Sequence, residues 1–379
     1  MHVAVDTLFR ANPGYELVLG DRLAAAERAT VLGDASMYGV LRPRHGTSLS
    51  PRAVSADTAL LFMTLGEPGT VPGYARSALA EGNGAALARL IADDVLEVQR
   101  DGAFVSGIRA TEPSPFGESD GGSGRIGELS RAALTYAESL VGLSDEEVAM
   151  RIYCYGRRPV TAAVRRLDER SLCDSAVSRT GWIPEPLSES RRAHWRSWRP
   201  RGGGPAAPVA YKLYVSPALE DVETALSAVA ETLAAIPGVI SFKLGVGAEG
   251  LCRPDKLVAY FERLDDLREA AARLTPALDG CSAQPVPFTA AITNDGLLSW
   301  GADPPAMKEA TSWRMWVAQR LAEYLGDAAR TPTDRDGNGD GDRDVAPWRH
   351  ALARLRLAGI DTATWTPAGG MWERALQWS

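Results

Sequence analysis

The sequence predicts an α+β protein, with a mixed-sheet domain in its C-terminal half and a mostly helical region before it. Two strand-like runs there each carry a single lysine, and amphipathic helices alternate with the strands. The expected order is strand 209–215, helix 219–236, strand 239–246, strand 256–261, helix 264–278, two further strands within 283–292 and 296–300, and helix 312–326.

The helix at 219–236 shows the clearest pattern. Three acidic residues lie in its first turn, where the helix dipole favours negative charge, and Pro237-Gly238 ends it. Its apolar residues are three or four apart, which places them on one helical face: Leu219, Val222, Leu226, Val229, Leu233 and Ile236. The second helix, at 264–278, likewise has Leu264, Leu267, Ala271, Leu274 and Leu278 on one face.

Polar and Gly/Pro-rich breaks divide the chain into an N-terminal region at 1–110, a helical region at 125–200 and a C-terminal domain at 205–379. Residues 1–110 contain helical spacing followed by a hairpin with an Asp101-Gly102 turn, which predicts a winged-helix-like unit with a peptide-docking or purely structural role. In the middle region, Ser144 and Glu147 form a capping-box signature. The run "RIYCYGRRPVT" that follows is interpreted as a solvated basic face.

Composition excludes several classes of function. A net charge of −7 argues against a nucleic-acid binder, and no signal-like or membrane-spanning segment is visible, so a cytoplasmic protein is expected. The four cysteines and four histidines are scattered, so no metal site is predicted. Residues 334–345 begin like a calcium loop, but Val345 stands where the bidentate glutamate belongs, which favours a solvated linker.

The two strand lysines, Lys212 and Lys243, are the centre of the predicted site. Charge within a buried strand is costly unless it is used, and Lys212 shares its strand face with Tyr214. Several cations without matching acids indicate an anionic ligand such as phosphate, and a lysine in such a pocket can act as a base. The alternative is that these lysines sit at strand ends and reach water. The other candidate site residues are Arg253, Lys256, Tyr260, Arg314 and Arg320.

Three segments carry a family resemblance: "YKLYVSP", "FKLGVGAEGLCRPDKLVAYF" and "TNDGLLSWGADPP". They resemble the Hop-type effector family of bacterial proteins, and within it the lyase subunits of class V lanthipeptide and thioamitide synthetases. That family is similar in turn to type III effector phosphothreonine lyases. The resemblance covers roughly residues 205–375. It implies a phosphothreonine-lyase-like domain that eliminates phosphate from phosphoserine or phosphothreonine in a precursor peptide, needs no cofactor and acts after a separate kinase-like subunit.

The resemblance also implies a role for each matching residue. Lys243 matches the base that abstracts the α-proton, and Lys212 matches the lysine that stabilises the enolate-like transition state. Arg253 and then Tyr260 follow at the family's phosphate-binding positions, with Lys256 a weaker phosphate candidate. A later phosphate-binding arginine is matched by Arg314 or Arg320. The family has a histidine as general acid where this sequence has Tyr214, so Tyr214, a lysine or water remain candidates for that role.

The sequence therefore leaves two functions open. The first is a phosphoserine/phosphothreonine lyase whose partners are a phosphorylated precursor peptide and a kinase-like subunit, with no nucleic acid or membrane involved. The second is a non-catalytic peptide-binding adaptor that keeps the fold without the chemistry. Tyr214 in place of histidine favours the adaptor, whereas both lysines and Arg253 favour the lyase.

Overall fold

The computed structural model confirms the α+β class. It describes residues 7–31, 37–47, 49–110, 121–162, 164–166, 173, 177, 180–201, 209–304, 311–330 and 346–368. The chain divides into two compact units: unit 1 comprises Met1–Glu118 and Glu323–Ala358, and unit 2 comprises Ser119–Ala322 and Gly359–Ser379. The predicted boundaries differ from this division: the described residues of 323–358 belong to unit 1, and those of 125–200 belong to unit 2.

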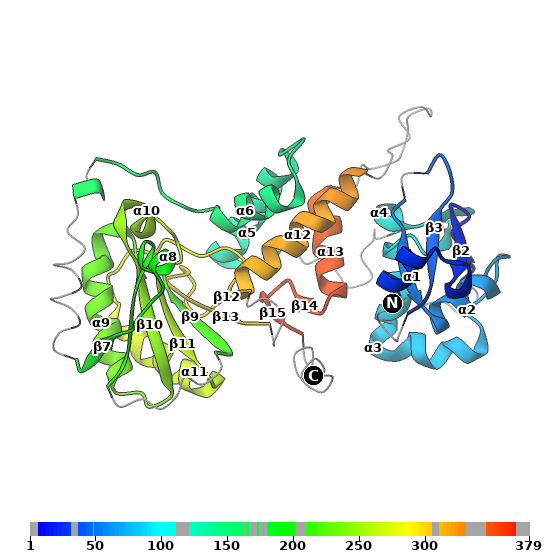
Figure 1. Ribbon diagram of the computed structural model, residues 1–379. Helices are drawn as coiled ribbons and strands as arrows, with labels where there is room; N and C mark the ends of the chain where they lie inside the picture. Colours follow the sequence, from blue (N-terminus) through cyan, green and yellow to red (C-terminus); the bar gives the residue numbers. More distant parts are fainter. Residues whose placement is uncertain are drawn as a thin grey trace. The chain divides into compact units, whose positions relative to one another are not determined.

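Unit 2 is built on a seven-stranded sheet in the order β12-β13-β9-β11-β10-β8-β7 (Figure 1). Every neighbouring pair is antiparallel, so the sheet is not mixed as expected. The helix at residues 222–234 connects β9 to β10, which would be parallel neighbours, but β11 lies between them and pairs antiparallel with both. The strands are β7 (Trp182–Pro184), β8 (Trp195–Pro200), β9 (Tyr211–Val215), β10 (Val239–Gly245), β11 (Leu257–Phe261), β12 (Ala290–Ala291) and β13 (Leu298–Ala302).

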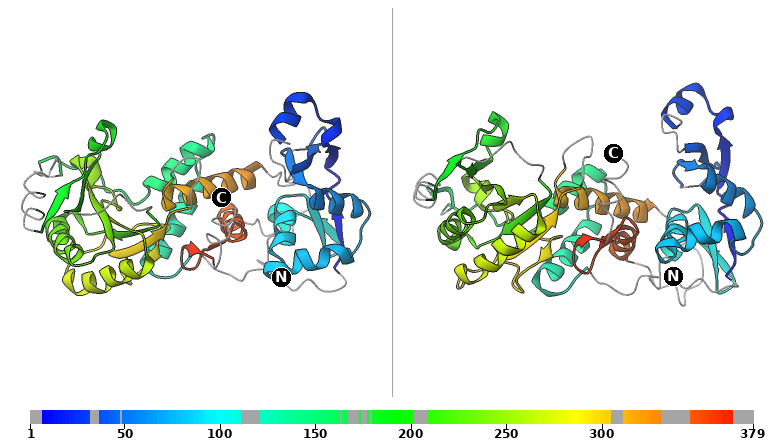
Figure 2. Two further views of the ribbon diagram at one scale, coloured as in Figure 1. Left: turned by 60° about the horizontal axis from the view of Figure 1, so that its bottom comes forward. Right: turned by 90° about the horizontal axis from the view of Figure 1, so that it is seen from below.

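Helices α9 (Val222–Ala234) and α11 (Leu264–Ala277) cover one face of this sheet (Figures 1 and 2). The short 3-10 helix η3 (Leu219–Asp221) leads into α9. The predicted apolar face of α9 is buried in the core together with the inward residues of β9, β10 and β11. Each fully buried leucine or valine contributes roughly 1.5–3 kcal/mol, so this core anchors the strands that carry the lysines.

Unit 2 also contains helices and short strands outside this sheet and its two covering helices. The predicted capping box is confirmed at the start of α6 (Asp145–Cys154), where Ser144 and Glu147 exchange side chain–backbone hydrogen bonds. These elements are α5 (Gly124–Glu138), α6 (Asp145–Cys154), η2 (Val164–Arg166), α8 (Glu189–Arg192), α10 (Gly247–Leu251), most of α12 (Trp313–Arg330), β14 (Ile360–Asp361) and β15 (Thr366–Pro367).

Unit 1 contains two three-stranded sheets, β1-β5-β6 and β2-β3-β4. The predicted hairpin is confirmed as β5–β6, with Asp101 and Gly102 at φ 49° and 82° as a type I′ turn requires. The sheet β2-β3-β4 was not predicted. The elements are β1 (Phe9–Ala11), β2 (Tyr15–Leu19), η1 (Gly20–Arg22), α1 (Ala25–Val31), β3 (Met37–Pro43), β4 (Arg52–Ser55), α2 (Ala56–Thr64), α3 (Gly73–Ala92), β5 (Leu96–Arg100), β6 (Ala103–Val105), α4 (Gly107–Ala110) and α13 (Pro347–Leu357).

Several predicted segments lie outside the described residues: most of the loop at 111–125, most of the linker at 199–208, and the candidate calcium loop at 334–345. Within the described part of the chain, no helix is both long and apolar enough to cross a membrane. The peptide-docking role of the N-terminal region stays a prediction.

Candidate active site

Lys212, Tyr214 and Lys243 lie on the same face of the sheet, opposite the face that α9 and α11 cover. Leu213 belongs to the helix-covered core and Tyr211 packs against it. Because successive strand residues alternate between faces, Lys212 and Tyr214 project the other way. The predicted orientation of the lysine strand is thus confirmed.

Strand β11 separates the two lysine strands. Tyr260 on β11 stands opposite Lys212, while Val258 stands between Tyr214 and Lys243 in one row across three strands. The Tyr260 ring centroid is 5.6 Å from Lys212 Nζ and 5.5 Å from Lys243 Nζ. The structure therefore brings both lysines to one aromatic ring, although their strands are not neighbours.

Among the described residues, Lys243 Nζ is held by aromatic rings and not by an acid. Its Nζ lies 3.7 Å from the centroid of the Trp195 ring and makes no hydrogen bond or ion pair with any described residue. Burial, together with the nearby positive charges of Lys212 and Arg253, lowers the pKa of Lys243 to about 7 against the opposing effect of Asp255. In a substantial fraction of the molecules, the Lys243 amine is therefore neutral near pH 7 and able to accept a proton.

Lys212 is held by a carboxylate. Its Nζ lies 2.5 Å from Asp303 Oδ2, and the residue is only 8% exposed. The other oxygen, Asp303 Oδ1, accepts a hydrogen bond from the backbone N–H of Trp313 at the start of α12. The carboxylate is thus fixed between the end of β13 and the beginning of a helix, and it holds the Lys212 ammonium in place.

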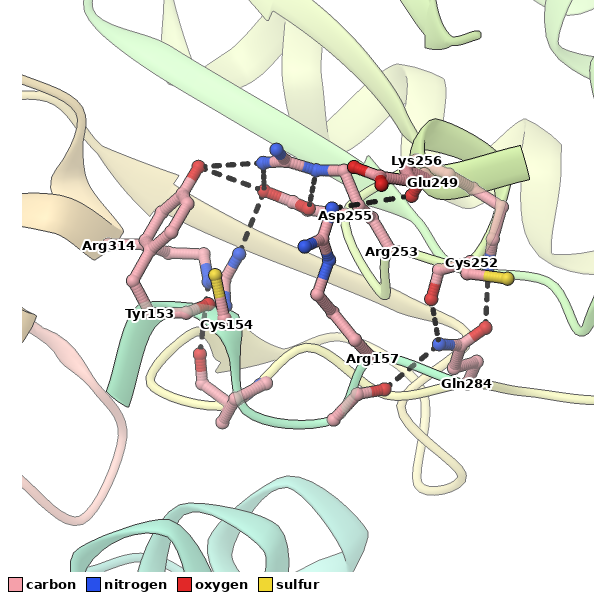
Figure 3. Close-up of polar contacts among 12 residues, drawn as sticks. Tyr153, Cys154, Arg157, Glu249, Cys252, Arg253, Asp255, Lys256, Gln284 and Arg314 are labelled. Carbon is pink, nitrogen blue, oxygen red and sulfur yellow. Dashed lines mark hydrogen bonds and ion pairs between the residues drawn. The ribbon is translucent and has the colours of Figure 1, made fainter. Parts of the chain in front are cut away.

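Arg253 is oriented by Asp255, two residues further along the chain (Figure 3). Arg253 Nε and Nη2 donate to the two Asp255 oxygens, each at 2.9 Å, and Nη2 also donates to the Tyr153 hydroxyl at 2.9 Å. The Arg253 guanidinium carbon lies 4.8 Å from the centroid of the Trp195 ring. The remaining nitrogen, Nη1, donates to no described residue, so one edge of this fork is available for an anion.

Arg314 binds the same carboxylate from α12. Its Nη1 lies 2.8 Å from Asp255 Oδ2, and its Nη2 donates to the backbone carbonyl of Tyr153 at 2.8 Å (Figure 3). Arg314 is 2% exposed. Burial alone would raise the pKa of the Asp255 carboxyl, but Arg314 and Arg253 outweigh it and hold the pKa well below its ordinary value. Asp255 is therefore a permanent anion between two arginines.

These pairs correct the expectation of cations without matching acids. Lys212 is matched by Asp303, and Arg253 and Arg314 share Asp255. The three cations still outnumber the two carboxylates by one charge before Lys243 is counted. The site therefore remains suited to an anion, but less strongly than the sequence indicated.

Tyr214 is covered by neighbouring apolar side chains. It is 3% exposed and forms a small cluster with Val258 and Val286. Burial, reinforced by the charge of Asp303, raises the pKa of the Tyr214 phenol well above its ordinary value. The phenol therefore keeps its proton at neutral pH and is a weak acid.

The structure places Lys256 in a different environment from the other two lysines. Its Nζ is fully buried and donates to the Pro217 carbonyl at 2.6 Å and to Gln284 Oε1 at 2.9 Å. Arg320 is partly buried on α12, six residues after Arg314 and so on another face of that helix. Neither residue joins the contacts around Asp255 that Arg253 and Arg314 make.

Sequence reasoning missed four residues of this site: Tyr153, Trp195, Asp255 and Asp303. Asp255 lies two residues after Arg253 in "CRPDK", so the sequence could have indicated an ion pair between them. Tyr153 lies in "RIYCYGRRPVT", whose arginines Arg151, Arg157 and Arg158 are exposed, as a solvated face predicts. Trp195 was missed because the strands β7 and β8 were not predicted.

No metal centre is formed by the described residues, since no group of three or more His, Cys, Asp or Glu side chains is arranged to hold an ion. The described side chains at the site offer nitrogen donors and aromatic faces instead. These groups suit an anionic ligand better than a cation.

No protein-family model and no curated protein matches the chain. Solved structures do show similarity. The effector protein of Pseudomonas syringae pv. tomato strain DC3000 is similar at 12% identity and a TM-score of 0.42, over 64% of this chain and 97% of that one. The effector of Pseudomonas syringae pv. syringae strain 61 is similar at 13% identity and a TM-score of 0.39, over 64% and 98%. The Chromobacterium violaceum phosphothreonine lyase effector is similar at 12% identity and a TM-score of 0.28, over 47% and 85%.

Proposed function

We propose that this protein is a lyase that eliminates phosphate from phosphoserine or phosphothreonine in a ribosomal precursor peptide, leaving dehydroalanine or dehydrobutyrine. The observation that carries the proposal is Lys243, a partly neutral amine with no acid partner among the described residues, on the face that also presents Lys212 and Arg253. A base near neutral pKa beside fixed cations is the arrangement that abstraction of a weakly acidic proton needs.

The reaction balances with the groups present. The Lys243 amine takes the α-proton, the electrons of that C–H bond form the Cα=Cβ double bond, and the Cβ–O bond breaks with its electron pair on the phosphate. Lys212 stabilises the negative charge that develops on the substrate carbonyl oxygen. The free edge of Arg253 binds the phosphate, while Asp255 keeps the guanidinium oriented.

The leaving group makes a weak demand on acid catalysis. A phosphate monoester departs as a stable anion, so its protonation is less critical than that of an alkoxide. Tyr214 carries a proton but is buried in a cluster with Val258 and Val286, which leaves a lysine or water as the alternative donor. The reaction therefore does not depend on a histidine at this position.

The natural-product setting is part of the proposal. The sequence resemblance in "YKLYVSP" and the two later segments supports a phosphorylated precursor peptide as substrate and a separate kinase-like subunit as its source. A cluster of cations in a chain with net charge −7 supports selection of a phosphorylated residue over an unmodified one.

One observation favours a second function, a non-catalytic peptide-binding adaptor. Tyr214 is buried in a cluster with Val286 and stands where the resembling lyases have a histidine acid, so a fold that has lost its chemistry would look similar here. An adaptor would bind phosphorylated peptide without changing it.

The two functions are separated by incubating the protein with a synthetic phosphothreonine peptide. Elimination releases inorganic phosphate and leaves a peptide that has lost phosphoric acid, whereas hydrolysis by a contaminating phosphatase leaves threonine. We expect the dehydrated product, and its loss in Lys243→Ala. Binding of the peptide with no product at any pH between 6 and 9 would support the adaptor instead.

A further inference from the structure

The Trp195 indole contacts two cations of the candidate site. Its ring centroid is 3.7 Å from Lys243 Nζ and 4.8 Å from the Arg253 guanidinium carbon. Trp195 begins β8 and stands opposite Gly245 on β10, two residues beyond Lys243 on the same face. The proposed reaction assigns roles to Lys243, Lys212 and Arg253 but none to Trp195.

We propose that Trp195 is a positioning residue whose π face holds Lys243 Nζ on the sheet and stabilises the ammonium that forms when Lys243 accepts a proton. The inference rests on the proposed function, because it concerns the base of that reaction. It adds a residue outside the phosphate and enolate contacts already described.

The three lysines of this sheet domain that the structure describes show why the π face matters. Lys212 Nζ is held by a carboxylate, and Lys256 Nζ is held by two oxygen acceptors, whereas Lys243 Nζ is held by an aromatic ring. A carboxylate stabilises a protonated amine strongly and favours its charged form, and neutral oxygen acceptors engage its N–H groups. An aromatic face attracts the ammonium more weakly and leaves the amine lone pair free. The contact is therefore suited to a lysine that must exist in both forms.

Other groups face Lys243 from several elements, and they must be separated from the effect of Trp195. Tyr260 lies 5.5 Å away but is shared with Lys212, so it does not distinguish the two lysines. The charged groups that act on Lys243 are Asp255 and Arg253 after α10, Lys212 on β9 and Arg191 on α8. All of them are kept in a Trp195 variant. Arg253, which also contacts the indole, is held independently by Asp255 and Tyr153, so a change in the titration of Lys243 reports on the indole.

The experiment compares Trp195→Leu and Trp195→Phe with Trp198→Phe. Leucine keeps apolar cover without a π face, so the pKa of Lys243 should fall and kcat should drop about tenfold as the base weakens. Phenylalanine keeps a smaller π face and should lose about threefold. Trp198 lies on the same strand but on the opposite face, buried in the core and stacked on Phe242 at 5.1 Å. Trp198→Phe should lower stability without moving the pH profile.

A second readout does not depend on turnover. The rate at which an acylating reagent labels the Lys243 amine is followed against pH by mass spectrometry of the peptide that contains it. The midpoint should lie at lower pH in Trp195→Leu than in wild type, with Trp195→Phe between them and Trp198→Phe unchanged. Unchanged labelling midpoints and pH profiles in both Trp195 variants would overturn the inference. Shifted midpoints in a protein that never releases phosphate would support Trp195 as the partner of Lys243 and overturn the lyase.

Discussion

Arg253 binds Asp255 through two parallel hydrogen bonds of 2.9 Å, although the two residues are only two positions apart. These two hydrogen bonds fix the guanidinium plane before any ligand binds. Arg253 Nη2, which donates to Asp255, also donates to the hydroxyl of Tyr153 on α6. Preorganisation of this kind lowers the ordering cost of binding. The arginine that we assign to phosphate is thus positioned by its own neighbour in sequence.

We expect Arg253→Ala to cost about 2–4 kcal/mol of transition-state stabilisation, which is roughly a 30- to 1,000-fold loss in kcat/KM. The loss arises because the phosphate loses its charged partner. Steady-state phosphate release measures it, with Arg263→Ala as control, since Arg263 is 71% exposed on the same unit. Wild-type activity in Arg253→Ala would show that the phosphate binds elsewhere.

Lys243→Ala should lower kcat by about 100- to 10,000-fold, the range that a general base contributes. Peptide binding should stay within a few-fold, because the phosphate contact at Arg253 is retained. Product formation by mass spectrometry and peptide affinity by fluorescence anisotropy check both parts. Full turnover in this variant removes Lys243 from the mechanism.

The pH dependence of kcat/KM should report the neutral form of Lys243. Burial lowers its pKa to about 7, so the active amine increases as pH rises through 7 and decreases below it. We expect activity to rise between pH 7 and 8, where the substrate phosphate, with a second pKa of about 6, is already mainly dianionic. A flat profile over this interval would contradict the assignment of a lysine base with this pKa.

Tyr214→Phe separates acid catalysis from unaided departure of phosphate. If Tyr214 is the proton donor, Tyr214→Phe slows elimination, and Tyr214→His retains more activity than Tyr214→Phe. If phosphate leaves unaided, Tyr214→Phe is nearly harmless while Lys212→Ala remains severe, because the enolate still needs its cation. Parallel kcat measurements decide between them, and a harmless Lys212→Ala would contradict the two-lysine site.

Lys256 should affect stability more than catalysis. Burial lowers the pKa of Lys256 to about 7, against about 10.4 in an unfolded chain, so the unfolded state binds more protons between these values. Its contribution to the free energy of unfolding therefore increases by up to about 3 kcal/mol from pH 7 to 9.5. Denaturant unfolding across this range should show a smaller rise in Lys256→Met than in wild type. An identical rise would show that the folded state keeps Lys256 charged.

The sequence by itself determined the features that depend on local order. The period of three and four in residues 219–236 gave the buried face of α9, and the two-residue period placed Lys212 and Tyr214 on one strand face. The Asp101-Gly102 hairpin and the Ser144 capping box were also predicted, because each is built from neighbouring residues.

Only the tertiary structure decided how the site is completed. Asp303, Trp195 and Tyr153 come from segments far from the residues they hold, and strand order decided that β11 and its Tyr260 separate the two lysines. Periodicity reports which face a side chain takes but not which strand lies beside it, since pairing depends on contacts distant in sequence. For the same reason, the sequence did not show which acids pair with Lys212 and Arg314. Only the structure showed that Lys243 has aromatic partners and no acid partner among the described residues.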